Sequence, residues 1–257
     1  MEILNSILAL DRDYSELLSD IKNSRLPLAA TGLSLNSKSA VLSAIYSHTK
    51  KKIAVITKDE AEALEIMNDA KALGINAINF PVRDYCIGNI SAYGKEYEQK
   101  RTDTLSKLLD GAFDLLILPA EAATQYTIPA NILKENRIKI SLADTLNVTD
   151  FCERLLSVGY SRCELVEGRG QFAIRGGLID IFPPSLENPV RIELWGEEVD
   201  SIAYFETDTQ RRTEQIGQVM ITPATGILYE SPESLIGIIE QHKATLKGKG
   251  SVKAKAL

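Results

Sequence analysis

Along the first 125 residues, segments with the apolar pattern of helices alternate with segments that have the apolar pattern of strands. Apolar side chains repeat every three to four positions in segments 3–8 and 17–21, which predicts two helices at the start of the chain. The elements predicted after them are helix 40–46, strand 52–56, helix 63–70, strand 77–80, helix 96–109 and strand 113–118. Thr57 and Glu60 have the spacing of a capping box before the helix through 63–70. Because strands that alternate with helices form mostly parallel sheets covered on both faces, we expect an α/β unit at about 25–125.

The pattern changes after residue 125. A strand is predicted at 138–141 and a helix at 148–158. After them, short strands are predicted between turns rich in glycine and proline, at 163–166, 171–175, 178–182, 190–195 and 201–205. Short loops between adjacent strands favour antiparallel pairing. We therefore expect an α/β protein with a first domain at 1–125, an α+β, largely antiparallel domain at 126–208, and a third segment at 209–257 that ends in a lysine-rich tail.

Composition narrows the classes of function. The 257 residues carry a formal net charge of -6, which argues against duplex DNA as the main partner, because DNA-binding surfaces are usually basic. The cysteines, Cys86, Cys152 and Cys163, form no CxxC pair, and with only two histidines a zinc site is not expected. The N-terminus lacks a signal-peptide pattern, and no stretch approaches the roughly 20 apolar residues of a membrane span. These features predict a cytoplasmic chain without a metal ion or a membrane partner.

Segment 32–39, GLSLNSKS, resembles a phosphate-binding loop in three of its positions. Gly32, Lys38 and Ser39 fit the pattern GxxxxGK[ST], but Ser37 replaces the second glycine. That glycine lets backbone N–H groups turn toward phosphates, and a side chain restricts the turn. The string DEAE at 59–62 lies beyond its strand, so no metal-holding acid is predicted. The alternatives are an ordinary turn before a helix, weak ribose or phosphate binding by Lys38, or a nucleotide site that has lost its function.

The most informative stretch is 166–204, which reads as a hairpin followed by a meander. Phe172 and Ile174 point to one side of their strand, and Arg175 points to the other. In a later strand Ile192 and Leu194 are opposed by polar residues and an indole, so one face of the sheet is predicted to be apolar and the other polar.

The string GQFAIRGGLIDIFPPSLENPVRIELWGEEVDSI at 170–202 closely resembles the second domain of UvrB and the matching domain of the transcription-repair coupling factors (Mfd). Segment 80–122 resembles the coupling-factor version of the preceding domain, and the likeness extends over about 25–229. It implies a helicase-like first domain with a degenerate phosphate loop, a second domain like UvrB domain 2, and at 209–257 a truncated return segment to the first domain. UvrB has a long DNA-clamping hairpin near the segment corresponding to 84–98, which is short here.

The resemblance implies an N-terminal module that docks UvrA in transcription-coupled nucleotide excision repair. Its UvrA contacts would be Arg162 and Arg175, with Arg169 replacing in part a basic position occupied here by alanine, and with Phe182 and Trp195 adding apolar contact. The ATP- and Mg-dependent motor of such proteins, and their contacts with RNA polymerase and DNA, belong to other domains. The chain itself is therefore expected to bind no cofactor and to catalyse no reaction.

Other interpretations stay open at this point. Arg162 and Arg175 could form solvated cross-strand pairs with Glu164 or Glu193, Trp195 could be a half-buried sheet residue, and three further arginines are predicted to be plain surface charges: Arg191, Arg211 and Arg212. A UvrB-like, nucleotide-dependent helicase fragment would bind ATP at Lys38. A DNA-binding module would show strongly salt-dependent affinity for DNA.

Overall fold

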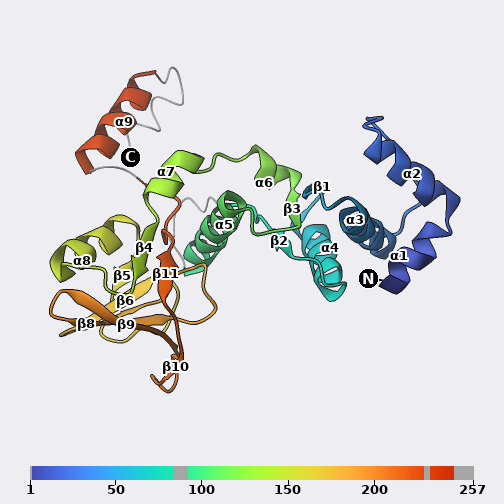
Figure 1. Cartoon of the computed structure of the whole chain (residues 1–257). Helices are drawn as coiled ribbons and strands as arrows, with labels where there is room; N and C mark the ends of the chain where they lie inside the picture. Colours follow the sequence, from blue (N-terminus) through green and yellow to red (C-terminus); the bar gives the residue numbers. More distant parts are fainter. Residues whose placement is uncertain (1, 84–91, 229–231, 246–257) are drawn as a thin grey trace.

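The first structural unit is a small parallel sheet with helices around it (Figure 1). The computed structural model describes residues 2–83, 92–228 and 232–245. The elements of this unit are α1 (Glu2–Ala9), α2 (Arg12–Lys22), α3 (Leu35–Thr49), β1 (Ile53–Thr57), α4 (Glu60–Ala72), β2 (Ala77–Asn79), α5 (Ala92–Asp110), β3 (Leu115–Pro119) and α6 (Ala120–Thr124). Within the described residues, β3 lies between β1 and β2 and pairs with both in parallel. The predicted order of helices and strands is confirmed.

One face of this sheet holds the core of the unit. Ile66 of α4 packs with Leu115 and Ile117 of β3, and all three side chains are buried. The expected cover on both faces is not seen at β1, where Ile56 is 66% exposed. The helix start also differs from expectation, because Asp59 is the N-cap of α4 and accepts a hydrogen bond from Glu62 N. The predicted Thr57–Glu60 box is therefore wrong by two residues.

The second unit contains a long sheet and a short one. Its elements are α7 (Ala130–Glu135), β4 (Ile138–Ser141), α8 (Val148–Ser157), β5 (Ser161–Arg162), β6 (Gln171–Arg175), β7 (Leu178–Ile181), β8 (Val190–Trp195), β9 (Glu198–Phe205), β10 (Arg212–Gln215), β11 (Gln218–Ile221) and α9 (Pro232–Thr245). In the described part of the chain the long sheet has the order β10-β9-β8-β7-β6-β5, and β4 pairs with β11. Only β5–β6 is parallel among these pairs, so the largely antiparallel prediction is confirmed.

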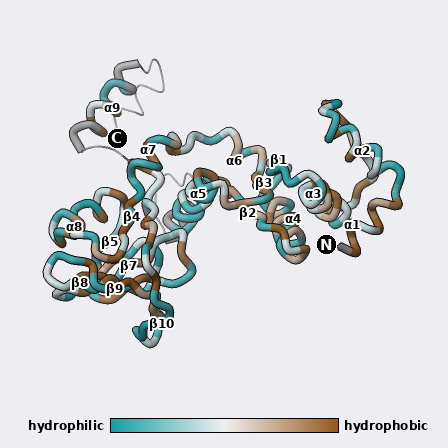
Figure 2. The backbone as a smooth tube through the Cα atoms, in the orientation of Figure 1, coloured by the Kyte–Doolittle hydropathy of each residue, from teal (hydrophilic) through white to brown (hydrophobic). Residues whose placement is uncertain are grey.

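The main core lies between α8 and one face of the long sheet. Phe172, Ile179 and Ile192 form its sheet side, and Phe151 and Leu155 of α8 close it. Figure 2 shows β8 and β9 as hydrophobic, brown segments, whereas the tip beside β10 is hydrophilic. Residues 163–166 form no strand, because the pairing with β6 stops at Arg162.

The strand pairing bears on where the second unit ends. β10 pairs with β9 and β11 pairs with β4, so residues 212–221 continue this unit beyond the expected boundary at 208. After β11 the chain meets α5 of the first unit, where Glu98 accepts hydrogen bonds from Thr225 Oγ1 at 3.0 Å and from Gly226 N. Gln99 Nε2 also donates to Arg169 O at 3.2 Å. These contacts tie α5 to the loop between β5 and β6 and to the segment that follows β11.

Two sequence-based predictions concern residues outside the ranges that the structure describes. The short segment expected at 84–98 includes residues 84–91, and the lysine-rich tail includes residues 246–257. Among the described helices, none combines the length and the apolar character needed to cross a membrane.

Candidate docking face

The face of the long sheet opposite α8 carries a row of four cross-strand partners. The register aligns Ala173 of β6 with Asp180 of β7, Asp180 with Arg191 of β8, and Arg191 with Ala203 of β9. Aligned partners project from the same face of a sheet. Two small alanines thus flank one acid and one arginine, which leaves room for long side chains to lie across the sheet.

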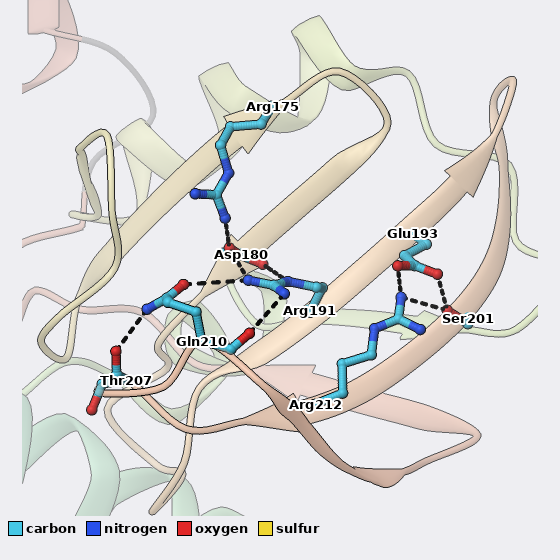
Figure 3. Close-up of polar contacts among 8 residues, drawn as sticks. All are labelled: Arg175, Asp180, Arg191, Glu193, Ser201, Thr207, Gln210 and Arg212. Atoms are coloured by element: carbon cyan, nitrogen blue, oxygen red, sulfur yellow. Dashed lines mark hydrogen bonds and ion pairs between the residues drawn. The ribbon is translucent and has the colours of Figure 1, made fainter.

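Asp180 is the centre of a polar network on this face (Figure 3). Its side chain is 1% exposed, and its two oxygens accept from Arg191 Nε at 2.7 Å and Arg191 Nη2 at 2.8 Å. Asp180 Oδ2 also accepts from Arg175 Nη2 at 2.5 Å. A carboxylate that receives a paired bond from one guanidinium and a single bond from another is held firmly in place.

Arg191 is fixed by more than Asp180. Its Nη1 donates to Gln210 O at 3.1 Å, and its guanidinium carbon lies 4.7 Å from the centre of the Phe205 ring. The hydrogen bonds to Asp180 raise the pKa of the Arg191 guanidinium above its ordinary value. Arg191 is therefore a structural cation with only 12% of its side chain exposed, and the expectation of a plain surface charge is wrong.

A second polar cluster lies on β8, β9 and β10 (Figure 3). Arg212 Nη2 forms an ion pair with Glu193 and lies 3.3 Å from Ser201 Oγ, which donates to Glu193 Oε2 at 3.0 Å. Arg212 is therefore an exposed charge, as predicted, but it is paired with Glu193. Glu193, considered as a partner of Arg175, is instead the partner of Arg212.

Trp195 is the exposed aromatic residue of this face. Alternation along β8 places it on the same side as Arg191 and Glu193, at the turn into β9 that Gly196 makes with a φ of 65°. Its side chain is 83% exposed, so the expectation of a half-buried sheet residue is wrong. Arg175, on the same face, keeps 44% of its side chain exposed. Together they present an indole and a guanidinium, which we call the Arg175–Trp195 face.

In segment 32–39, whose residues 35–39 form the first turn of α3, the candidate phosphate-binding groups contact other protein groups. Lys38 Nζ pairs with Glu62 Oε1 at 2.9 Å, and this hydrogen bond is the main reason that the pKa of Glu62 lies below its ordinary value. Ser37 N donates to the side chain of Ser34, the N-cap of α3. Ser39 is buried and donates to Leu35 O. No strand precedes this loop in the described residues, since 24–34 have no regular structure.

Comparisons with known proteins give matches to the second unit and to most of the chain. Residues 138–226 match the family model described as the UvrB interaction domain. The chain is 29% identical over 235 residues to the transcription-repair-coupling factor of Bacillus subtilis, covering 91% of this chain and 20% of that protein. For the Staphylococcus epidermidis factor the identity is 31% over 205 residues, 77% of this chain and 17% of that protein. The chain is a relative of the transcription-repair-coupling factors. It spans about a fifth of the length of the curated relatives it matches.

The structure places only some of the residues predicted to contact UvrA on one face of the sheet. Register aligns Arg162 with Phe172, whose side chain lies in the core under α8, so Arg162 and Arg175 project from opposite faces. Arg169 is exposed and donates to Leu186 O, with its guanidinium carbon 5.6 Å from the centre of the Phe182 ring. Phe182 is buried with Val166 and supports Arg169 from below.

Sequence reasoning on this coupling-factor relative missed the role of Asp180. A signal was present, because a single acid between Ile179 and Ile181 in a short apolar strand needs a cationic partner. Within the described residues no group of three histidine, cysteine or acidic side chains is placed to hold a metal ion.

Proposed function

We propose that this chain docks UvrA and thereby brings nucleotide excision repair to stalled transcription. The curated relatives are about five times as long as this chain, and we propose that a motor and the contacts with RNA polymerase and DNA belong to other domains. The observation that carries the proposal is the Arg175–Trp195 face within a UvrB interaction domain.

The chemistry of this face supports a protein partner. Arginine and tryptophan are enriched at the residues that dominate binding energy, and arginine binds carboxylates through paired hydrogen bonds. Arg169 is exposed near the β5–β6 edge and lies against Phe182, and we place both at the rim of this interface. Arg162 is exposed at the same edge but projects from the α8 side, so we propose that it reaches the partner only around the edge of the sheet.

Arg175→Ala is expected to weaken UvrA binding about tenfold, since a hydrogen bond to a charged group contributes about 1.5 kcal/mol or more. The measurement is a calorimetric titration of the chain with UvrA. Arg12→Ala is the matched control, because Arg12 is exposed on α2, away from the sheet. Equal affinities of wild type and Arg175→Ala would move the interface elsewhere. A titration at roughly 50 µM chain detects binding free energies of about −6 kcal/mol or stronger. If the wild-type chain shows no UvrA binding at this concentration, the docking function is rejected.

We also propose that loop 32–39 binds no nucleotide, so that the chain has no ATPase activity of its own. The support is that Lys38 is neutralised by Glu62 and that the Ser39 hydroxyl, which would hold Mg²⁺ in a working loop, is turned to Leu35 O. The rival function, a UvrB-like nucleotide-dependent helicase fragment, needs both groups.

Mg-ATP is expected to leave the melting temperature of the chain unchanged. A ligand present at a hundred times its Kd would stabilise the folded state by about 2.7 kcal/mol, which a thermal-shift measurement detects easily. Lys38→Ala is the control for specificity. A stabilisation by Mg-ATP that disappears in Lys38→Ala would instead favour the rival function.

A further inference from the structure

Asp180 links two arginines that differ in how firmly they are held. Arg191 is bound through both edges of its guanidinium, to Asp180 and to Gln210, and it lies over Phe205. Arg175 has one hydrogen bond among the described residues, from Nη2 to Asp180 Oδ2. The exposed Arg175 is therefore attached, through its hydrogen bond to Asp180, to the firmly held pair of Asp180 and Arg191.

The charges of this network are unequal. One carboxylate is shared by two guanidinium groups, so a net positive charge remains, and the exposed member is Arg175. Arg175 Nε and Nη1 have no hydrogen-bond partner among the described residues. A planar guanidinium held at one nitrogen, with other donors facing solvent, can bind a second carboxylate.

A long arginine side chain normally loses rotamer entropy when it enters an interface. A contact that fixes the side chain beforehand removes part of that loss. Buried ion pairs add little to stability compared with apolar residues of similar volume, so stability alone gives a weak reason for Asp180 in an otherwise apolar strand.

We propose that Asp180 is a positioning residue, which holds Arg175 in one orientation so that its free edge receives a carboxylate of the docking partner. This inference rests on the proposed function only for the identity of that partner. The fixed orientation of Arg175 is a property of the free chain and can be measured without UvrA.

The first test observes the Arg175 Nε–Hε group by NMR in the free chain, with Asp180→Asn as the variant. The structure predicts that this substitution increases side-chain motion and hydrogen exchange at Arg175. Glu193→Gln is the matched control, because it releases Arg212 from a carboxylate on the same sheet and leaves Asp180 in place. Unchanged motion and exchange at Arg175 in Asp180→Asn would overturn the proposal, whatever UvrA does.

Asp180→Asn leaves Arg191 without its counter-ion and could prevent folding. The double variant Asp180→Asn/Arg191→Gln removes both charges together and keeps side chains of comparable size that can hydrogen bond. The same increase in Arg175 motion is expected in this variant. A folded double variant with an ordered Arg175 contradicts the positioning role.

A double-mutant cycle with UvrA tests the consequence for binding. Asp180→Asn is expected to weaken binding about fivefold to tenfold, and to have no further effect in an Arg175→Ala background. Independent, multiplying effects of the two substitutions would show that Asp180 does not act through Arg175. A wild-type chain that fails to bind UvrA rejects the docking function, while the NMR test still decides the role of Asp180.

Discussion

Trp195→Ala is expected to weaken UvrA binding by about thirtyfold or more, since truncating a dominant interface residue costs about 2 kcal/mol or more. The indole is 83% exposed, so the free chain gains little from it, and a bound partner would cover a large apolar area. The free energy of unfolding is expected to change by less than about 0.5 kcal/mol, as for other exposed positions. Calorimetric titration and urea denaturation measure the two quantities.

Tyr126→Ala is the matched control for this experiment. Tyr126 is an aromatic residue with 93% exposure, and it follows α6 of the first unit, away from the long sheet. Its removal is expected to leave UvrA binding unchanged. A Trp195→Ala chain that binds as well as wild type would remove the indole from the interface and leave Arg175 as the main contact.

The fold was predictable where its signals are local. The apolar periods of α4 and α8 identify these helices, because each buries one stripe. Strands β6 to β9 are identified by short apolar runs between turn residues. The end of β5 was missed because its pairing with β6 stops after two residues, which no local pattern indicates. The exposed side of β1 was missed for the same reason, since Ile56 is as apolar as a buried residue.

The candidate site was less predictable, because strand register decides it. Arg175 and Arg191 look alike in sequence, yet register and the position of Asp180 leave 44% of the Arg175 side chain exposed and only 12% of the Arg191 side chain. Register also separates Arg162 from Arg175, although both are arginines of the expected contact surface. The exposure of Trp195 could have been predicted from the sequence. Trp195 is the last residue of β8, directly before the turn at Gly196, where few neighbouring side chains cover it.

Segment 32–39 was predictable from the sequence only in part. The substitution at Ser37 was visible in sequence, but the partner of Lys38 was not. Glu62 comes from the first turn of α4, and its carboxylate reaches Lys38 across 24 positions of sequence. Glu62 Oε1 lies 2.9 Å from Lys38 Nζ, so this carboxylate competes with a phosphate for the Lys38 ammonium group.

Phe172→Ala is expected to lower the free energy of unfolding by about 3–5 kcal/mol, the range for large-to-small changes of buried aromatic residues. Phe172 is fully buried in the core cluster that includes Phe151 and Leu155 of α8, so its truncation removes packed volume from this core. Urea denaturation followed by circular dichroism measures the loss. Ile174→Ala is the control, because Ile174 is on the same strand and face but only partly buried, so its loss should be smaller. Since Phe172 and Arg175 project from opposite faces, a folded Phe172→Ala chain should still bind UvrA. A loss below about 1 kcal/mol, typical of surface changes, would contradict the packing of α8 on β6 that places the docking face on the other side.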